Sequence, residues 1–254
     1  MGLAITASIY FTGCAAHNSA DIASITFTST DGVTIYARLY YPMQQDTATM
    51  PPGLILLHRA GASHEVWQSF THRARQTGYM LLALDLRGHG DSTSPPEYPN
   101  NHRDYNSTHW LACLDDFSQA REILISHGAN PDNIGVIGEG LGANLGLHWY
   151  YREQRLHALV ALSPGLEYQG IQTESVAREL TQRPVLYLAS DKDNYAVRSA
   201  TSLRDMTPGF AELRTFSGFA HGTDLFVTSP NAMEITLQWL DGILKQDAGH
   251  SGSS

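Results

Sequence analysis

Cysteine is nearly absent from this 254-residue chain, in which only Cys14 and Cys113 occur. Two cysteines cannot build a disulfide framework, and they do not have the paired spacing of a cysteine-type metal site. A chain of this length can bury a large core without cross-links. The sequence therefore excludes a small disulfide-stabilised scaffold, and its length is compatible with one α/β domain.

Positive charge is also scarce, with 16 Lys and Arg against 25 Asp and Glu and a net charge of −9. Binding to nucleic acid depends on clustered cations that neutralise phosphates, so we expect no nucleic-acid partner. The 12 histidines show no HExxH or comparable spacing, and we expect neither a metal nor another cofactor. The hydrophobic content of 42% argues against disorder.

The apolar run at the N-terminus, from Leu3 to Phe11, is too short to span a bilayer. It leads into Thr12-Gly13-Cys14 and resembles a bacterial lipoprotein signal, although no Lys or Arg precedes it. The resemblance implies an exported protein, attached to a membrane through lipidated Cys14. A truncated or mis-started N-terminus is the alternative, and the protein would then be cytoplasmic. We expect residues 1–21 to be leader and linker, 22–245 one domain, and 246–254 a flexible tail.

Strand-like and helix-like segments alternate along the rest of the chain. Strands are predicted on either side of the turn signal Asp31-Gly32 and at 53–57, 80–84, 133–137, 157–162, 184–189 and 211–216. Helices are predicted at 64–77, 107–125 (capped by Ser107 or Thr108), 141–151, 196–206 and 229–244. This alternation predicts an α/β fold, a mostly parallel sheet of about eight strands with helices on both faces.

The stretch VIGEGLGANLG, residues 136–146, has the pattern of a nucleophile elbow without its nucleophile. Strand-like residues precede it, helix-like residues follow it, and Gly138 and Gly142 are spaced as in G-x-S-x-G. The central position is Gly140. An ordinary strand-to-helix turn is the alternative explanation for this glycine.

Polar segments follow the other predicted strands, at the sheet edge where such folds bind ligands. They are His58–Gly61, Asp85–Gly90, Ser190–Asp193 and Ser217–Asp224. An acid and then a histidine follow the elbow in the chain, which is the order of the α/β-hydrolase triad.

Six segments in this order, LLHRAGAS, LALDLRGHGDS, IGEGLGANLG, ALSPGLEY, LASDKDNYA and FAHGTDLF, resemble a small α/β-hydrolase of the esterase or dienelactone-hydrolase type. The resemblance covers roughly residues 22–245. The stretch between Ser163 and Pro184 is too short for a large lid domain. It implies that Gly140 stands at the nucleophile position, Asp193 at the acid and His221 at the base. It also implies that the backbone N–H groups of Ala60 and Leu141 would bind an oxyanion, although Arg59 departs from the commoner His-Gly pair there.

Other residues in these segments have competing interpretations. Glu139 and Ser163 are alternative nucleophiles, and Asp191 is an alternative acid. We expect structural hydrogen bonds from His58 and His89. We expect Asp85, Arg87 and Asp91 to brace the turn at RGHGDS.

Three explanations of Gly140 remain open. The chain could be an esterase inactivated at its nucleophile, a natural pseudo-hydrolase that binds a ligand or partner, or an enzyme that uses only Asp193 and His221 to activate water or move a proton. All three share the hydrolase fold and site. The prediction is an esterase-like hydrolase with a defective elbow and a small ester or acyl compound as its ligand, which is an argument by fold analogy.

Overall fold

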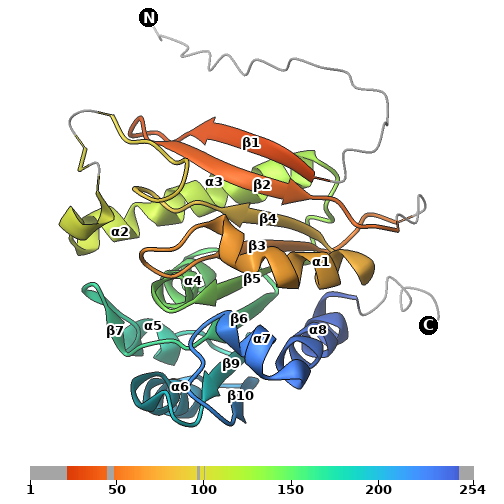
Figure 1. Ribbon diagram of the computed structural model, residues 1–254, viewed down its shortest axis with the longest axis vertical. Helices are drawn as coiled ribbons and strands as arrows, with labels where there is room; N and C mark the ends of the chain where they lie inside the picture. The colour runs from red at the N-terminus through yellow and green to blue at the C-terminus, as the bar shows by residue number, and fades with distance from the viewer. Residues whose placement is uncertain (1–21, 45–48, 96–97, 100, 246–254) are drawn as a thin grey trace, which may run out of the picture.

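One eight-stranded sheet with helices on both faces forms the framework of the protein in a computed structural model (Figure 1). The structure describes residues 22–44, 49–95, 98–99 and 101–245, so the predicted leader with Cys14 and the predicted tail lie outside it. The strands are β1 (Ile22–Thr28), β2 (Thr34–Tyr40), β3 (Gly53–Leu57), β4 (Met80–Leu84), β5 (Ile134–Glu139), β6 (Ala158–Leu162), β9 (Val185–Ser190) and β10 (Ala211–Phe216). Their order in the sheet is β1-β2-β4-β3-β5-β6-β9-β10.

The sheet is parallel except at one edge, where β2 runs antiparallel to both β1 and β4. Strands β3, β4, β5, β6 and β9 are buried along their whole length. Continuous apolar runs such as GLILL and MLLAL are typical of parallel strands that are covered on both faces. The predicted mostly parallel sheet of about eight strands is confirmed.

Helices cover the sheet in two layers, each with its own hydrophobic core. One layer contains α1 (Gln68–Gln76), α7 (Asp224–Thr228) and α8 (Pro230–Leu244), with the short helix η1 (His64–Trp67). The other contains α2 (Ser107–Leu111), α3 (Cys113–Ser126), α4 (Leu141–Arg152), α5 (Glu174–Arg178) and α6 (Asn194–Met206), with η2 (His102–Asp104) nearby. In the part of the chain described, no helix has the length and hydropathy needed to cross a membrane.

The prediction of one helix over 107–125, capped by Ser107 or Thr108, is wrong. The helix is divided at Ala112 into α2 and α3, and its N-cap is Asn106. The Asn106 side chain accepts from the N–H of His109 at 3.1 Å, and the His109 ring accepts from the N–H of Asn106 at 3.1 Å. This reciprocal pair satisfies two backbone donors. The cap is therefore Asn106, and Ser107 is the first residue of α2.

The segment between β6 and β9 adds only α5 and a small hairpin, β7 (Glu167–Tyr168) and β8 (Ile171–Gln172). The prediction that no large lid domain lies here is confirmed, but the hairpin and α5 were not predicted. The five-residue helix α7 was not predicted either.

The winding of the sheet changes direction at β3. The chain passes from β3 to β4 on one side and then returns to the other side of β3 as β5. The segments after β3 and β5 therefore separate at this point, which is where open α/β sheets bind their ligands. These two segments contain Arg59, Ala60 and the elbow at Gly140.

Candidate active site

Asp193 and His221 lie side by side because they follow neighbouring parallel strands. The last pair of the β9–β10 register is Ser190 with Phe216, so both loops leave the same edge. The Nδ1 atom of His221 is 2.6 Å from Oδ2 of Asp193. Asp193 also accepts, at 3.4 Å, from the N–H of Ala196 as the N-cap of α6, which fixes its orientation. The predicted hydrogen bond between the two residues is confirmed.

Asp191, the competing acid, has a different contact. Its carboxylate accepts a hydrogen bond from the N–H of Gly218 at 2.9 Å. This contact supports the loop after β10, and the imidazole of His221 is paired with Asp193 instead.

The elbow places position 140 directly in front of His221. Gly140 has φ +53° and ψ −118°, a conformation that side chains rarely adopt outside strained functional turns. A Cβ atom at position 140 would lie 3.3 Å from Nε2 of His221 and 3.1 Å from Cβ of Arg59. A hydroxyl at this position would therefore be within hydrogen-bond reach of the imidazole, which is the geometry of a nucleophile and its base.

Two backbone donors adjoin this position. The N–H of Leu141 is the first of α4, and the N–H of Ala60 lies in the loop after β3. Within the described ranges, neither N–H has a protein acceptor. Helix N-termini leave such donors unsatisfied, and an oxyanion hole uses them. The residues predicted as oxyanion donors are therefore available, although their role stays a prediction.

The two alternative nucleophiles are occupied by structural contacts. The carboxylate of Glu139 is fully buried and forms an ion pair with Arg59 at 2.9 Å. The hydroxyl of Ser163 is buried and accepts from the N–H of Gly222 at 2.9 Å. Both side chains therefore support the loops around position 140, and neither is presented as a nucleophile.

His58 and His89 hold the loop after β3, as predicted. Nδ1 of His58 donates to the carbonyl of Arg59 at 2.7 Å, while its Nε2 accepts from the N–H of Leu86 at 2.9 Å. Nδ1 of His89 donates to the carbonyl of Arg87 at 2.8 Å, while its Nε2 accepts from the N–H of Gly61 at 2.9 Å. Each ring therefore has to be neutral, because a protonated imidazole cannot accept.

Burial, aided by the neighbouring His89, lowers the pKa of His58 from 6.5 to about 3. Burial also lowers the pKa of His89 from 6.5 to about 4, with a further contribution from His102. Between pH 6.5 and 4 the unfolded chain thus binds up to two more protons at these residues than the folded chain binds. The free energy of unfolding is therefore expected to fall as the pH falls through this window, by up to about 1.4 kcal/mol per pH unit for each histidine.

Urea unfolding at a series of pH values measures this effect. His89→Gln keeps an acceptor for Gly61 but cannot be protonated, so its stability should fall less steeply below pH 6.5. His72→Gln is the control, because His72 is exposed and should leave the slope unchanged. An equal slope in the unaltered protein and in His89→Gln would contradict the assignment.

Arg87 does not brace the RGHGDS turn as predicted. Its fully buried guanidinium binds Asp116 of α3 at 2.6 Å and 2.8 Å, and it also binds Asp31 in the β1–β2 hairpin. Asp85 does brace the turn, because it accepts from the N–H of Asp91 at 2.8 Å. The difference arises because the long Arg87 side chain leaves the turn and reaches buried carboxylates on other elements.

Tyr168 was missed by the sequence analysis, although it lies beside the candidate dyad. Its ring is edge-on to that of His221, with the centroids 6.4 Å apart. A Cβ on Gly165 would be 2.7 Å from the Tyr168 ring, so glycine is required there for the ring to pack. Burial and the nearby Asp193 carboxylate raise the pKa of Tyr168. The sequence signal was weak, because Tyr168 lies in a two-residue strand.

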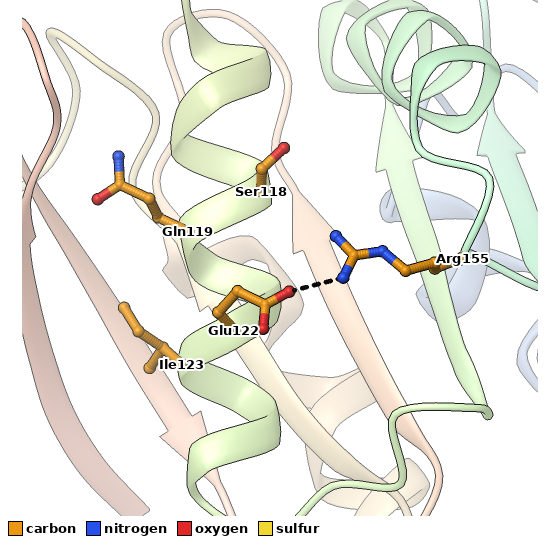
Figure 2. Close-up of a pocket in the computed structure, with 5 residues that line it drawn as sticks. All are labelled: Ser118, Gln119, Glu122, Ile123 and Arg155. Atoms are coloured by element: carbon orange, nitrogen blue, oxygen red, sulfur yellow. Dashed lines mark ion pairs between the residues drawn. The ribbon is translucent and has the colours of Figure 1, made fainter.

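A surface depression on α3, shown in Figure 2, is separate from these residues. It is lined by Ser118, Gln119, Glu122, Ile123 and Arg155. Glu122 and Arg155 form an exposed ion pair at 3.3 Å, a kind of contact that contributes little to stability. The depression contains none of the predicted site residues. Among the residues placed by the structure, no group of three or more His, Cys, Asp and Glu is arranged to hold a metal ion.

Comparisons with known proteins identify the family. The family model described as serine aminopeptidase, S33, matches residues 52–206, which include Gly140 and Asp193 and end before His221. A 76-residue segment is 30% identical to bifunctional epoxide hydrolase 2 of Mus musculus and covers 30% of this chain but only 14% of that protein.

Two solved structures share the fold at low sequence identity. Acetyl xylan esterase from Paenibacillus sp. R4 has a TM-score of 0.70 and 15% identity, with 88% of this chain and 84% of that chain covered. An esterase from Pyrococcus furiosus has a TM-score of 0.69 and 15% identity, with 88% and 93% covered. The family model matches more than half of the chain, and the sheet agrees with the fold of these neighbours. This chain belongs to the serine aminopeptidase S33 family of α/β hydrolases.

Proposed function

We propose that this protein is a carboxylic-ester hydrolase in which glycine replaces the serine nucleophile, so that it is a catalytically inactivated esterase. The observation that carries the proposal is the geometry at position 140. The backbone keeps φ +53° and directs a Cβ to within 3.3 Å of Nε2 of His221, which is itself bonded to Asp193. An ordinary strand-to-helix turn does not require a conformation that directs its side-chain position at a histidine–aspartate pair.

A serine at position 140 would complete a familiar reaction. Its Oγ would attack the ester carbonyl carbon while His221 takes the hydroxyl proton, and Asp193 would hold the imidazole in the correct tautomer. The N–H groups of Ala60 and Leu141 would stabilise the oxyanion of the tetrahedral intermediate. His221 would then return the proton to the departing alcohol, and water would hydrolyse the acyl-enzyme. With Gly140 the first bond cannot form, so the cycle cannot start.

The ligand proposed for the site is a small ester or acyl compound, because only a short hairpin and α5 lie between β6 and β9. Membrane attachment through a lipidated Cys14 remains part of the proposal, and mass spectrometry of the native N-terminus would test it. A pseudo-hydrolase would bind such a compound without turnover. A dyad enzyme would turn it over with Gly140 in place.

Covalent labelling with a fluorophosphonate tests the proposal. The probe should react with the Gly140→Ser variant at position 140 and not with the Gly140 protein. Gly140→Ala is the matched control, since it adds the same Cβ without a hydroxyl. A folded Gly140→Ser protein that takes no label would overturn the proposal.

A further inference from the structure

The loop after β3 has three successive backbone N–H groups, those of Arg59, Ala60 and Gly61, and within the described part of the chain only the outer two donate to side chains. The N–H of Arg59 donates to Oε1 of Glu139 at 3.2 Å, and the N–H of Gly61 donates to Nε2 of His89 at 2.9 Å. The N–H of Ala60, between them, meets no protein acceptor in the region that the structure describes. Two buried side chains thus hold the amides on either side of the predicted oxyanion donor.

Glu139 holds the loop of His221 at the same time. Its Oε2 accepts from the N–H of Thr223 at 2.7 Å, two residues after His221. Gly222 approaches so closely that a Cβ there would be 2.1 Å from Oε2 of Glu139, and its φ is +59°. Only glycine combines this φ with this approach. The carboxylate is therefore in contact with both loops that flank position 140.

The charge of Glu139 is balanced locally. Its carboxylate is fully buried and accepts two hydrogen bonds from Nη1 of Arg59, at 2.9 Å and 3.0 Å, besides the two from backbone N–H groups. A buried carboxylate requires such donors. Because Glu139 also directly precedes Gly140 in the chain, one side chain links the oxyanion loop, the elbow and the histidine loop.

We propose that Glu139 is a positioning residue, which sets the Ala60 N–H and the His221 imidazole at their working distances from the nucleophile position. This inference rests on the proposed function and adds a residue to its machinery. Glu139 acts through the two loops and does not itself touch the substrate. Arg59 has a supporting role, because its guanidinium neutralises the carboxylate.

The activity test uses Glu139→Gln in the Gly140→Ser background. The glutamine amide has the size of the carboxylate, but its NH₂ group cannot accept a hydrogen bond. It would have to face one of the backbone N–H groups from which Glu139 now accepts, and that hydrogen bond would be lost. We expect kcat for p-nitrophenyl acetate to fall about 10- to 100-fold, since losing one oxyanion donor costs about 10²- to 10³-fold and misplacing it costs less. KM should change less than about twofold, because the donor is needed in the transition state.

The control is Glu153→Gln, which removes a carboxylate paired with Arg155 at the far end of α4. It should leave kcat unchanged. If Glu139→Gln does not fold, Arg59→Met is the second variant, because it removes the guanidinium but keeps the backbone N–H. It should lower kcat about 3- to 10-fold, again with KM nearly constant.

A second readout needs no turnover. In the Gly140 protein, the short contact between Nδ1 of His221 and Asp193 is expected to give a downfield proton NMR signal, and Glu139→Gln should shift it or broaden it by faster exchange. Glu153→Gln should not. An unchanged kcat and an unchanged signal in folded Glu139→Gln would overturn the positioning role. If Gly140→Ser is inactive but the signal responds to Glu139→Gln, the positioning role stands and the esterase proposal fails.

Discussion

Replacement of Gly140 by serine is expected to raise the rate of p-nitrophenyl acetate hydrolysis at least about 10³-fold over the unaltered protein. The expectation follows from the cost of the reverse change, since removing the serine from a working triad lowers kcat on the order of 10⁶-fold. Asp193 and His221, the proposed acid and base, already contact each other, and Nε2 of His221 is 3.3 Å from the Cβ position. Initial rates at several ester concentrations would measure the gain.

The same substitution should destabilise the protein. A side chain at φ +53° costs about 1–3 kcal/mol, and its Cβ would press on Cβ of Arg59 at 3.1 Å. Gly140→Ala should show this destabilisation without any gain in rate, which separates the hydroxyl from the strain. Hydrolysis by the Gly140 protein itself that disappears in His221→Ala would favour the dyad reaction instead.

Gly142→Ala is expected to lower the free energy of unfolding by about 4 kcal/mol or more, or to prevent folding. The Cβ would lie 2.3 Å from the carbonyl oxygen of Leu57 and 2.5 Å from that of His58. These are backbone atoms at the end of β3, and they cannot rotate away as a side chain could. The first turn of α4 would have to move off the sheet, so the elbow would be lost with it.

Gly146→Ala is the matched control, one turn further along the same helix. Its nearest neighbour would be Cδ1 of Leu159 at 3.4 Å, which is ordinary van der Waals contact. Alanine is favoured over glycine inside a helix by about 1 kcal/mol, so this variant should be as stable as the parent or slightly more stable. Urea unfolding monitored by circular dichroism would compare the two. A similar loss of unfolding free energy in both variants would contradict the prediction, because of these two glycines only Gly142 closely approaches backbone atoms.

The strands and the dyad could be predicted because their signals are local and strong. Runs such as GLILL and ALVAL have few alternatives to a buried strand. The order of the elbow, Asp193 and His221 along the chain sufficed to place all three at one sheet edge, because parallel strands bring their carboxyl ends together. The prediction that His221 lies within hydrogen-bond reach of Asp193 rested on their positions after the neighbouring strands β9 and β10.

What escaped prediction depends on contacts between distant segments. Glu139 was weighed only as a nucleophile, since nothing near it in the sequence reveals Arg59, 80 residues earlier, or Thr223, 84 residues later. The β7–β8 hairpin turns through Gln169 at φ +53°, and glutamine is not a residue type that signals a turn with positive φ. The cap at Asn106 was missed because its partner in the box is a histidine rather than the usual glutamate.

The position of β10 at the edge of the sheet has a consequence for the dynamics of the site. Among the strands that the structure describes, β10 pairs only with β9. It is half-exposed along its length, whereas β5 beneath the elbow is buried throughout. Local openings in a native protein concentrate in such weakly covered elements. Opening of β10 would carry His221 away from the elbow while the central strands stay paired. Amide protons of β10 should therefore exchange with deuterium well before those of β5, and the dyad would disassemble at a fraction of the free energy of global unfolding.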